Sequence, residues 1–228
     1  MKTLKDVILE KLKVDDIVIN SDTLSDKIKE KYKLVYNPKT NCYDCNTDIR
    51  VEGDLIENGN FICDFGVVKG NFNCSYLDGL KSLIGAPKEV GGNFACSGCE
   101  NLKSLIGAPK EIGGYFSCNF CKNLESLKGA PEKINSFFNC ENCNSLKSLD
   151  GAPKEVGKGF YCSECENLES LKGAPIKVGE DFYCTSCKSL KSLKNGPKEV
   201  KGWFKCTKCK NLKDYDISNT KIGGKLVK

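Results

Sequence analysis

The sequence predicts a mainly β fold in which short coils of 22 residues stack into a solenoid. The first observation is a constant step of 22 residues at which a Val or Ile returns along the chain. These residues are Val68, Val90, Ile112, Ile134, Val156, Val178, Val200 and Ile222. The second is a Phe-x-Cys alternation, the period of a strand with one buried face. A fixed period of this length is typical of solenoids, because one unit alone cannot bury its apolar residues.

Residues 1–38 are predicted to form a small helical N-terminal segment. Residues 3–13 carry apolar side chains at helical intervals, 17–19 read as a short strand, and 24–32 read as a second helix. Pro38 follows an Asn and ends this segment. Two interpretations stay open: a cap over the end of the solenoid, or a docking or oligomerisation element.

Residues 39–67 are predicted to be an irregular entry coil. Cys42 and Cys45 form a C-x-x-C pair outside the main repeat register. Two similar Gly-Asn-Phe-x-Cys stretches only 11 residues apart suggest a half-length coil or a hairpin. Residues 68–228 then form the solenoid proper, with about eight or nine coils over the whole chain.

The residue types of each regular coil predict which positions face the core and where the chain turns. In the coil of Phe94, the ring and Cys96 point inward, and Cys99 falls at the turn leaving the strand. An L-x-x-L segment carries the chain away, and Gly-Ala-Pro turns it on the far side. Three positions per coil should point outward, namely the residues before Phe, after Phe and after the first Cys. These three vary freely between coils, whereas the inward positions do not.

The stretch Phe94-x-Cys96-x-x-Cys99-x-x-Leu102 and its recurrences resemble the leucine-rich repeat family. The resemblance is greatest to short-repeat bacterial and bacteriophage members, which have an extended convex side in place of a helix. It implies a concave strand face that binds a protein partner. The protein would be a host-interacting factor in a bacterial cytoplasm or, for a phage structural protein, part of a virion. In that family the Cys99 position is usually Asn, with Cys as a substitute, and the strand Cys is a departure.

The 16 Cys residues have three interpretations, and the chain has no His. Redox chemistry or disulfides are disfavoured, because each C-x-x-C pair sits between a strand and an extended segment rather than at a helix N-terminus. Because there is no signal-peptide core and no run of about 18 apolar residues, we expect a cytoplasmic protein with reduced thiols. The thiols then pack as small core side chains, and no cofactor is needed. Alternatively, C-x-x-C pairs bind zinc and make a metal-stabilised scaffold, with Cys42 and Cys45 as the candidate ligands.

The candidate partner-binding residues lie at the outward positions. They are Tyr115, Phe137, Tyr161, Tyr183 and Trp203, which should form a diagonal aromatic band, followed by Lys205 and Lys208. Exposed aromatic residues are candidate hot spots for a protein partner, although β propensity alone also places aromatic residues on strands.

Charge adds a third hypothesis. The net charge is +5, and residues 181–228 hold 12 Lys against 4 acidic residues, a balance of +8 that leaves −3 elsewhere. These coils could bind an anion or nucleic acid, although the single Arg, Arg50, lies outside them. With no His, phosphate loop or nucleophile elbow, we expect no enzymatic activity.

Overall fold

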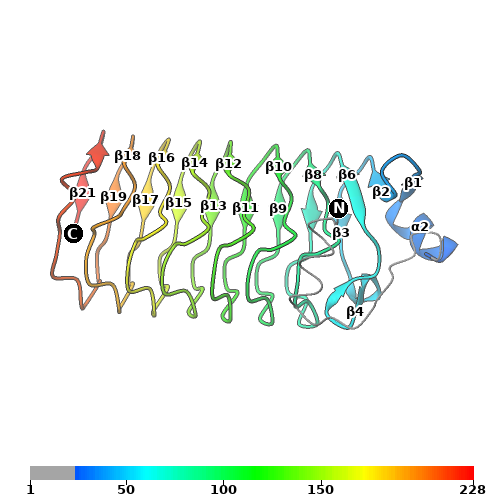
Figure 1. Cartoon of the computed structure of the whole chain (residues 1–228), viewed down its shortest axis with the longest axis horizontal. Coiled ribbons are helices and arrows are strands. Elements are labelled where there is room, and N and C mark those ends of the chain that lie inside the picture. The colour runs from blue at the N-terminus through cyan, green and yellow to red at the C-terminus, as the bar shows by residue number, and fades with distance from the viewer. Residues whose placement is uncertain (1–23) are drawn as a thin grey trace, which may run out of the picture.

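The computed structural model describes residues 24–228 and shows a mainly β solenoid of about eight stacked parallel turns (Figure 1). This confirms the predicted fold class. Helix α2 (Asp26–Tyr32) lies at the N-terminal end of the stack and matches the helix expected over 24–32. The elements predicted over 3–13 and 17–19 lie outside the described residues.

The front sheet takes one two-residue strand from each coil. Neighbouring strands pair in parallel with equivalent residues opposite each other, so that Phe138 lies between Phe116 and Phe160. In the described chain its strands are β3 (Ile49–Arg50), β7 (Phe72–Asn73), β9 (Phe94–Ala95), β11 (Phe116–Ser117), β13 (Phe138–Asn139), β15 (Phe160–Tyr161), β17 (Phe182–Tyr183), β19 (Phe204–Lys205) and β21 (Leu226–Val227).

Two side sheets are formed by the strands that precede the front strands. The first contains β1 (Val35–Asn37), β2 (Cys42–Cys45), β6 (Phe65–Val68), β8 (Glu89–Val90) and β10 (Glu111–Ile112). The second contains β12 (Lys133–Ile134), β14 (Glu155–Val156), β16 (Lys177–Val178), β18 (Glu199–Val200) and β20 (Lys221–Ile222). The entry region adds a 3-10 turn η2 (Gly53–Leu55) and the hairpin β4 (Ile56–Glu57) and β5 (Asn60–Phe61), so that of the two forms expected there, a half-length coil or a hairpin, the structure contains a hairpin.

The core consists of ladders of identical side chains. The rings from Phe94 to Phe182 stack with centroids 5.1 to 5.4 Å apart, and all are fully buried. Both Cys positions and both Leu positions of the regular coils are buried beside them. The predicted inward and outward facing of the strand is therefore confirmed for the core.

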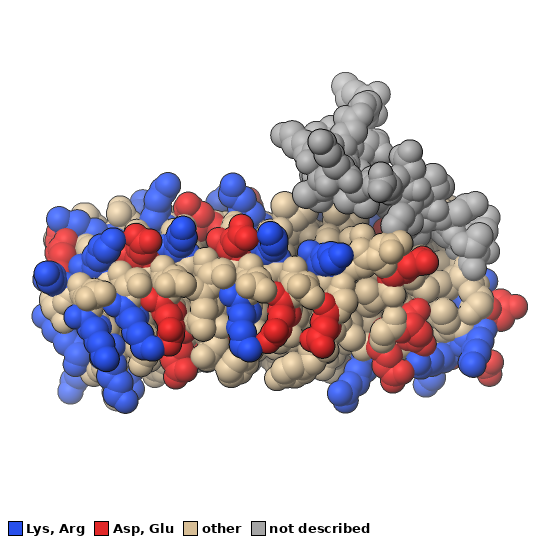
Figure 2. Space-filling model, turned by 90° about the horizontal axis from the view of Figure 1, so that it is seen from below, with Lys and Arg blue, Asp and Glu red and all other residues tan. Residues whose placement is uncertain are grey.

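The stack is nearly straight in both views of the molecule (Figures 1 and 2), in contrast to the expected concave strand face. The far side of each coil is extended and hydrogen-bonded from coil to coil, as in the bond from Leu105 N to Lys128 O (2.9 Å). Because neither side contains a wider element such as a helix, both sides advance by the same strand spacing. The front sheet is consequently a flat surface.

The side sheet is interrupted between β10 and β12, although the front sheet continues across that point. Elsewhere the residue after the Val or Ile donates its N–H to the preceding coil, as Gly157 does to Ile134 O (2.8 Å). A Cβ at Gly113 would lie 2.0 Å from Gly91 O, so a glycine is favoured there. Each regular coil has at least one Gly in this pair of positions, except the coil with Asn135 and Ser136. We infer that two adjacent Cβ atoms keep β12 away from β10.

Replacing both residues with glycine should close this interruption. In the variant Asn135→Gly/Ser136→Gly, we expect the hydrogen-exchange rate of the amides of residues 134–136 to fall at least about tenfold. Two or three new hydrogen bonds of about 1 kcal/mol each would be offset by about 0.5–1 kcal/mol per glycine, so hydrogen exchange is more sensitive than global stability. Lys158→Gly, in a coil that is already paired, is the control. Unchanged exchange in the double variant would contradict this account.

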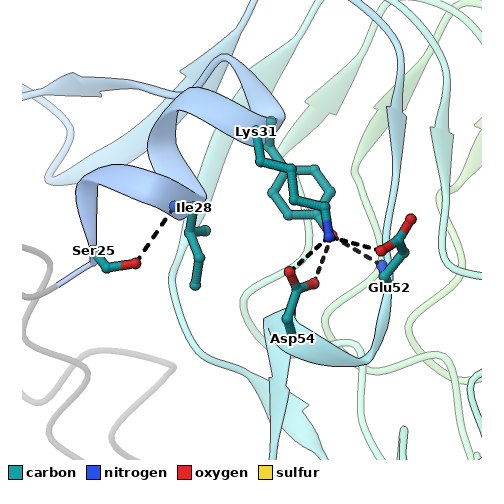
Figure 3. Close-up of polar contacts among 6 residues, drawn as sticks. Ser25, Ile28, Lys31, Glu52 and Asp54 are labelled. Atoms are coloured by element: carbon teal, nitrogen blue, oxygen red, sulfur yellow. Dashed lines mark hydrogen bonds and ion pairs between the residues drawn. The ribbon is translucent and has the colours of Figure 1, made fainter.

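Helix α2 is attached to the first coils by a polar network (Figure 3). Ser25 caps the helix by accepting from Ile28 N (3.4 Å). Lys31 Nζ lies 2.7 Å from Glu52 Oε2 and 2.8 Å from Asp54 Oδ2, and the Tyr32 hydroxyl donates to Asp54 Oδ1 (2.6 Å). Tyr32 is also buried in the core. These contacts agree with a cap at this end.

Acidification should loosen this attachment. Burial raises the pKa of Asp54, but the hydrogen bonds from Lys31 and Tyr32 outweigh it and hold that pKa below its usual value. The stabilisation is thus complete above the unfolded pKa of about 3.9 and is lost as the pH falls through the lowered folded pKa. Because the group is partly exposed, we expect the exchange protection of α2 amides to fall by about fivefold at most. Asp54→Asn should remove this pH dependence, and an unchanged profile in that variant would refute the assignment.

Candidate partner-binding surface

Four of the predicted aromatic residues form a continuous stack on the outer face of the front sheet. The Tyr115 and Phe137 rings lie 4.6 Å apart and nearly parallel, at an angle of 10°. Phe137 and Tyr161 follow at 6.0 Å, and Tyr161 and Tyr183 at 5.4 Å. All four side chains are half-buried, because each covers part of its neighbour. We call these four residues the aromatic stack.

The aromatic stack changes position within the coil, and a glycine permits this. Tyr115 and Phe137 stand before their Phe, whereas Tyr161 and Tyr183 stand after it. A Cβ at Gly159 would lie 2.2 Å from the Tyr161 hydroxyl oxygen, so the Tyr161 side chain leans over the space left by Gly159. It thereby comes into line with Phe137. Four of the five rings of the predicted diagonal band thus form a continuous row, and Trp203 lies in the next coil without a ring contact among the described residues.

The C-terminal part of the band is organised by Asp181. The Tyr183 hydroxyl donates to Asp181 Oδ2 (2.9 Å), and this bond, followed by burial, raises the pKa of Tyr183. Asp181 Oδ1 accepts from Trp203 N (2.7 Å). Lys205 Nζ lies 5.8 Å from the Tyr183 ring centroid, within cation–π range. Trp203 is 51% exposed, and Lys208 is also exposed at the turn of the same coil.

The structure also shows polar contacts that the sequence analysis missed. Before Phe72, Phe94 and Phe116, the side chain of one coil accepts the N–H of the next, as Asn93 Oδ1 does from Tyr115 N (3.0 Å). The recurrence of Asn at this position, in Asn71 and Asn93, could have indicated these side-chain-to-backbone hydrogen bonds. Ser97 and Ser163 are buried, although they were expected to face solvent. Some of the outward positions therefore stabilise the stacking of the coils and are not free to contact a partner.

The second Cys of each regular coil has a defined hydrogen-bonding role. Its thiol donates to the carbonyl of the first Cys of the preceding coil, as Cys121 does to Cys96 O and Cys143 to Cys118 O (3.1 and 3.2 Å). The same bond recurs from coil to coil at 3.1 to 3.3 Å. Burial raises the pKa of first-position thiols such as Cys140 well above the usual value, which keeps them protonated.

The candidate zinc ligands bond to separate carbonyl groups. Cys42 Sγ lies 3.3 Å from Thr40 O, and Cys45 Sγ lies 3.4 Å from Tyr32 O. Across residues 24–228, no group of three or more His, Cys, Asp or Glu is arranged to hold a metal ion. The zinc hypothesis stays a prediction that metal analysis must test.

Comparison with known proteins leaves the family open. No protein-family model, curated protein or solved structure matches this chain. Membership of the leucine-rich repeat family stays a prediction from the repeat motif. Within residues 24–228, none of the helices has the length and apolar character needed to span a bilayer.

Proposed function

We propose that this protein is a non-enzymatic binding module that recognises a partner protein through the outer face of its front sheet. The observation that carries the proposal is the aromatic stack, which continues toward the exposed Trp203. Half-buried rings held by their neighbours lose little side-chain freedom on binding, and aromatic residues dominate the energetics of protein interfaces. The setting we propose, from the repeat motif, is the cytoplasm of a bacterium, with the protein encoded by the cell or by a bacteriophage.

Site-specific photocrosslinking tests this proposal. Benzoylphenylalanine at position 161 should give a discrete crosslinked species in cells that express the protein natively. The control is the same group at Ile176, which is 49% exposed beside the side sheet and away from the aromatic stack. We expect crosslinking at 161 only, and its loss when Phe137 and Tyr183 are changed to Ser. Equal crosslinking at both positions, or none at 161, would overturn the proposal.

A further inference from the structure

The C-terminal end of the stack carries an excess of Lys, since residues 198–228 hold nine Lys against three acidic residues. Ion pairs join adjacent coils at Lys122–Glu100 (2.7 Å), Lys154–Glu132 (3.0 Å) and Lys191–Glu169 (3.1 Å). Nine Lys lie between Lys198 and Lys228, and none of them forms an ion pair within the described residues. Figure 2 shows Lys side chains gathered at this end of the molecule, whereas both signs alternate in the middle.

The sequence explains this change in pattern. In the middle coils, Lys and Glu alternate at equivalent positions 22 residues apart, as in the pair of Glu166 and Lys188. In the last regular coil the alternation stops, because Lys210 follows Lys188 and Lys213 follows Lys191. Like charges at neighbouring positions repel each other, so this end holds a positive potential that the chain itself does not neutralise.

Part of this charge lies in the same coil as an exposed apolar side chain, Trp203, and in the next coil. Trp203 leans toward the last coil, where a Cβ at Gly224 would lie 2.5 Å from its Cδ1. Lys205 and Lys208 belong to the same coil, and Lys225 occupies the position equivalent to Trp203 in the next. Asp181 is engaged by the Tyr183 hydroxyl and by Trp203 N. We call Trp203, Lys205, Lys208 and Lys225 the basic Trp site.

We propose that the basic Trp site binds an extended acidic segment of the partner protein. Carboxylates of this segment pair with Lys205, Lys208 and Lys225, and an apolar side chain of the segment covers Trp203. The inference rests on the proposed function and states the chemistry of the partner. Charge complementarity favours this occupant, because Lys side chains without ion pairs beside an exposed aromatic residue match acidic and apolar residues in alternation.

The observations favour a peptide over a nucleic acid. Bases bind single-strand sites by stacking on free aromatic faces. Here the rings of the aromatic stack cover one another, and Lys205 lies over Tyr183. Arg50, the single Arg, lies on β3 near the other end of the front sheet.

Fluorescence titration provides the test, because Trp203 is the single Trp of the chain. The probe is the 12-residue peptide (Glu-Leu-Asp-Phe)3, and its matched control is the uncharged (Gln-Leu-Asn-Phe)3. We expect the acidic peptide to change Trp203 emission, with a Kd that rises with salt concentration. The uncharged peptide should have a Kd at least about tenfold higher. A 12-nucleotide oligothymidylate forms the nucleic-acid arm.

Two triple variants with the same change in net charge separate a local site from general attraction. Lys205→Gln/Lys208→Gln/Lys225→Gln should weaken acidic-peptide binding about tenfold. The control replaces three paired residues, Lys122, Lys154 and Lys191, with Gln and should change the Kd by about twofold or less. Equal losses in both variants, equal binding of both peptides, or tighter binding of the oligothymidylate would overturn the inference. Because the titration uses a defined peptide, its failure is distinguishable from failure of the position-161 crosslink.

Discussion

Phe138→Ala is expected to lower the free energy of unfolding by about 3–5 kcal/mol, the largest effect of any single substitution considered. Phe138 is fully buried in the middle of the ring ladder, with its ring centroid 5.2 Å from that of Phe116 and 5.3 Å from that of Phe160. Truncation removes both contacts and leaves a cavity that the two-residue strands on each side have little freedom to fill. Urea unfolding followed by circular dichroism measures the loss.

Tyr161→Ala provides the matched control for this prediction. Tyr161 lies one coil further along on the outer face and also contacts two rings, Phe137 and Tyr183. Because its side chain is half-exposed, we expect a cost of about 1 kcal/mol or less. If Tyr161→Ala destabilised the protein more than Phe138→Ala, the assignment of core and outer face would be wrong.

Cys143→Ala is expected to lower the free energy of unfolding by about 1–3 kcal/mol, more than the loss of one sulfur atom from the core would suggest. The Cys143 thiol donates to Cys118 O (3.2 Å), and both residues are fully buried. Without that donor, a carbonyl group at the end of the front strand would be left in the core without a partner. Cys143→Ser retains a donor and should recover most of the loss.

Cys140 is the internal comparison, because it lies in the same coil and is equally buried. Its thiol donates no bond of this kind in the described chain, and Cys140→Ala should therefore cost only the small cavity, about 1 kcal/mol. Serine should give no recovery at this position, because a buried hydroxyl without a good partner is unfavourable. If serine rescued both positions equally, the hydrogen-bonding role of the second Cys would be refuted.

The fold was predictable because the 22-residue period indicates a solenoid and the Phe-x-Cys alternation indicates a strand with one buried face. The period requires stacking, and the alternation states which side chains face the core. The aromatic band was likewise predictable, since Tyr115 and Phe137 occupy equivalent positions in adjacent coils.

Other features depend on distances that the sequence does not contain. Asn135 and Ser136 were visible as departures from glycine, but their effect follows from a carbonyl lying about 2 Å from a Cβ position, as at Gly113. Straightness depends on both sides of the coil advancing equally. The lean of Tyr161 over Gly159 depends on the space left by a missing side chain. Each is a consequence of contacts between coils rather than of the residue types alone.

The interruption between β10 and β12 also has a consequence for cooperativity. In a repeat protein, the coupling free energy between neighbouring units decides whether the array unfolds as one body or in parts. The weakest coupling along this array should lie between the coils of Ile112 and Ile134, which lack side-sheet pairing. An N-terminal block with helix α2 and a C-terminal block with the basic Trp site can then unfold separately. Because Tyr115 belongs to one block and Phe137 to the other, the aromatic stack is complete only while both are folded and joined.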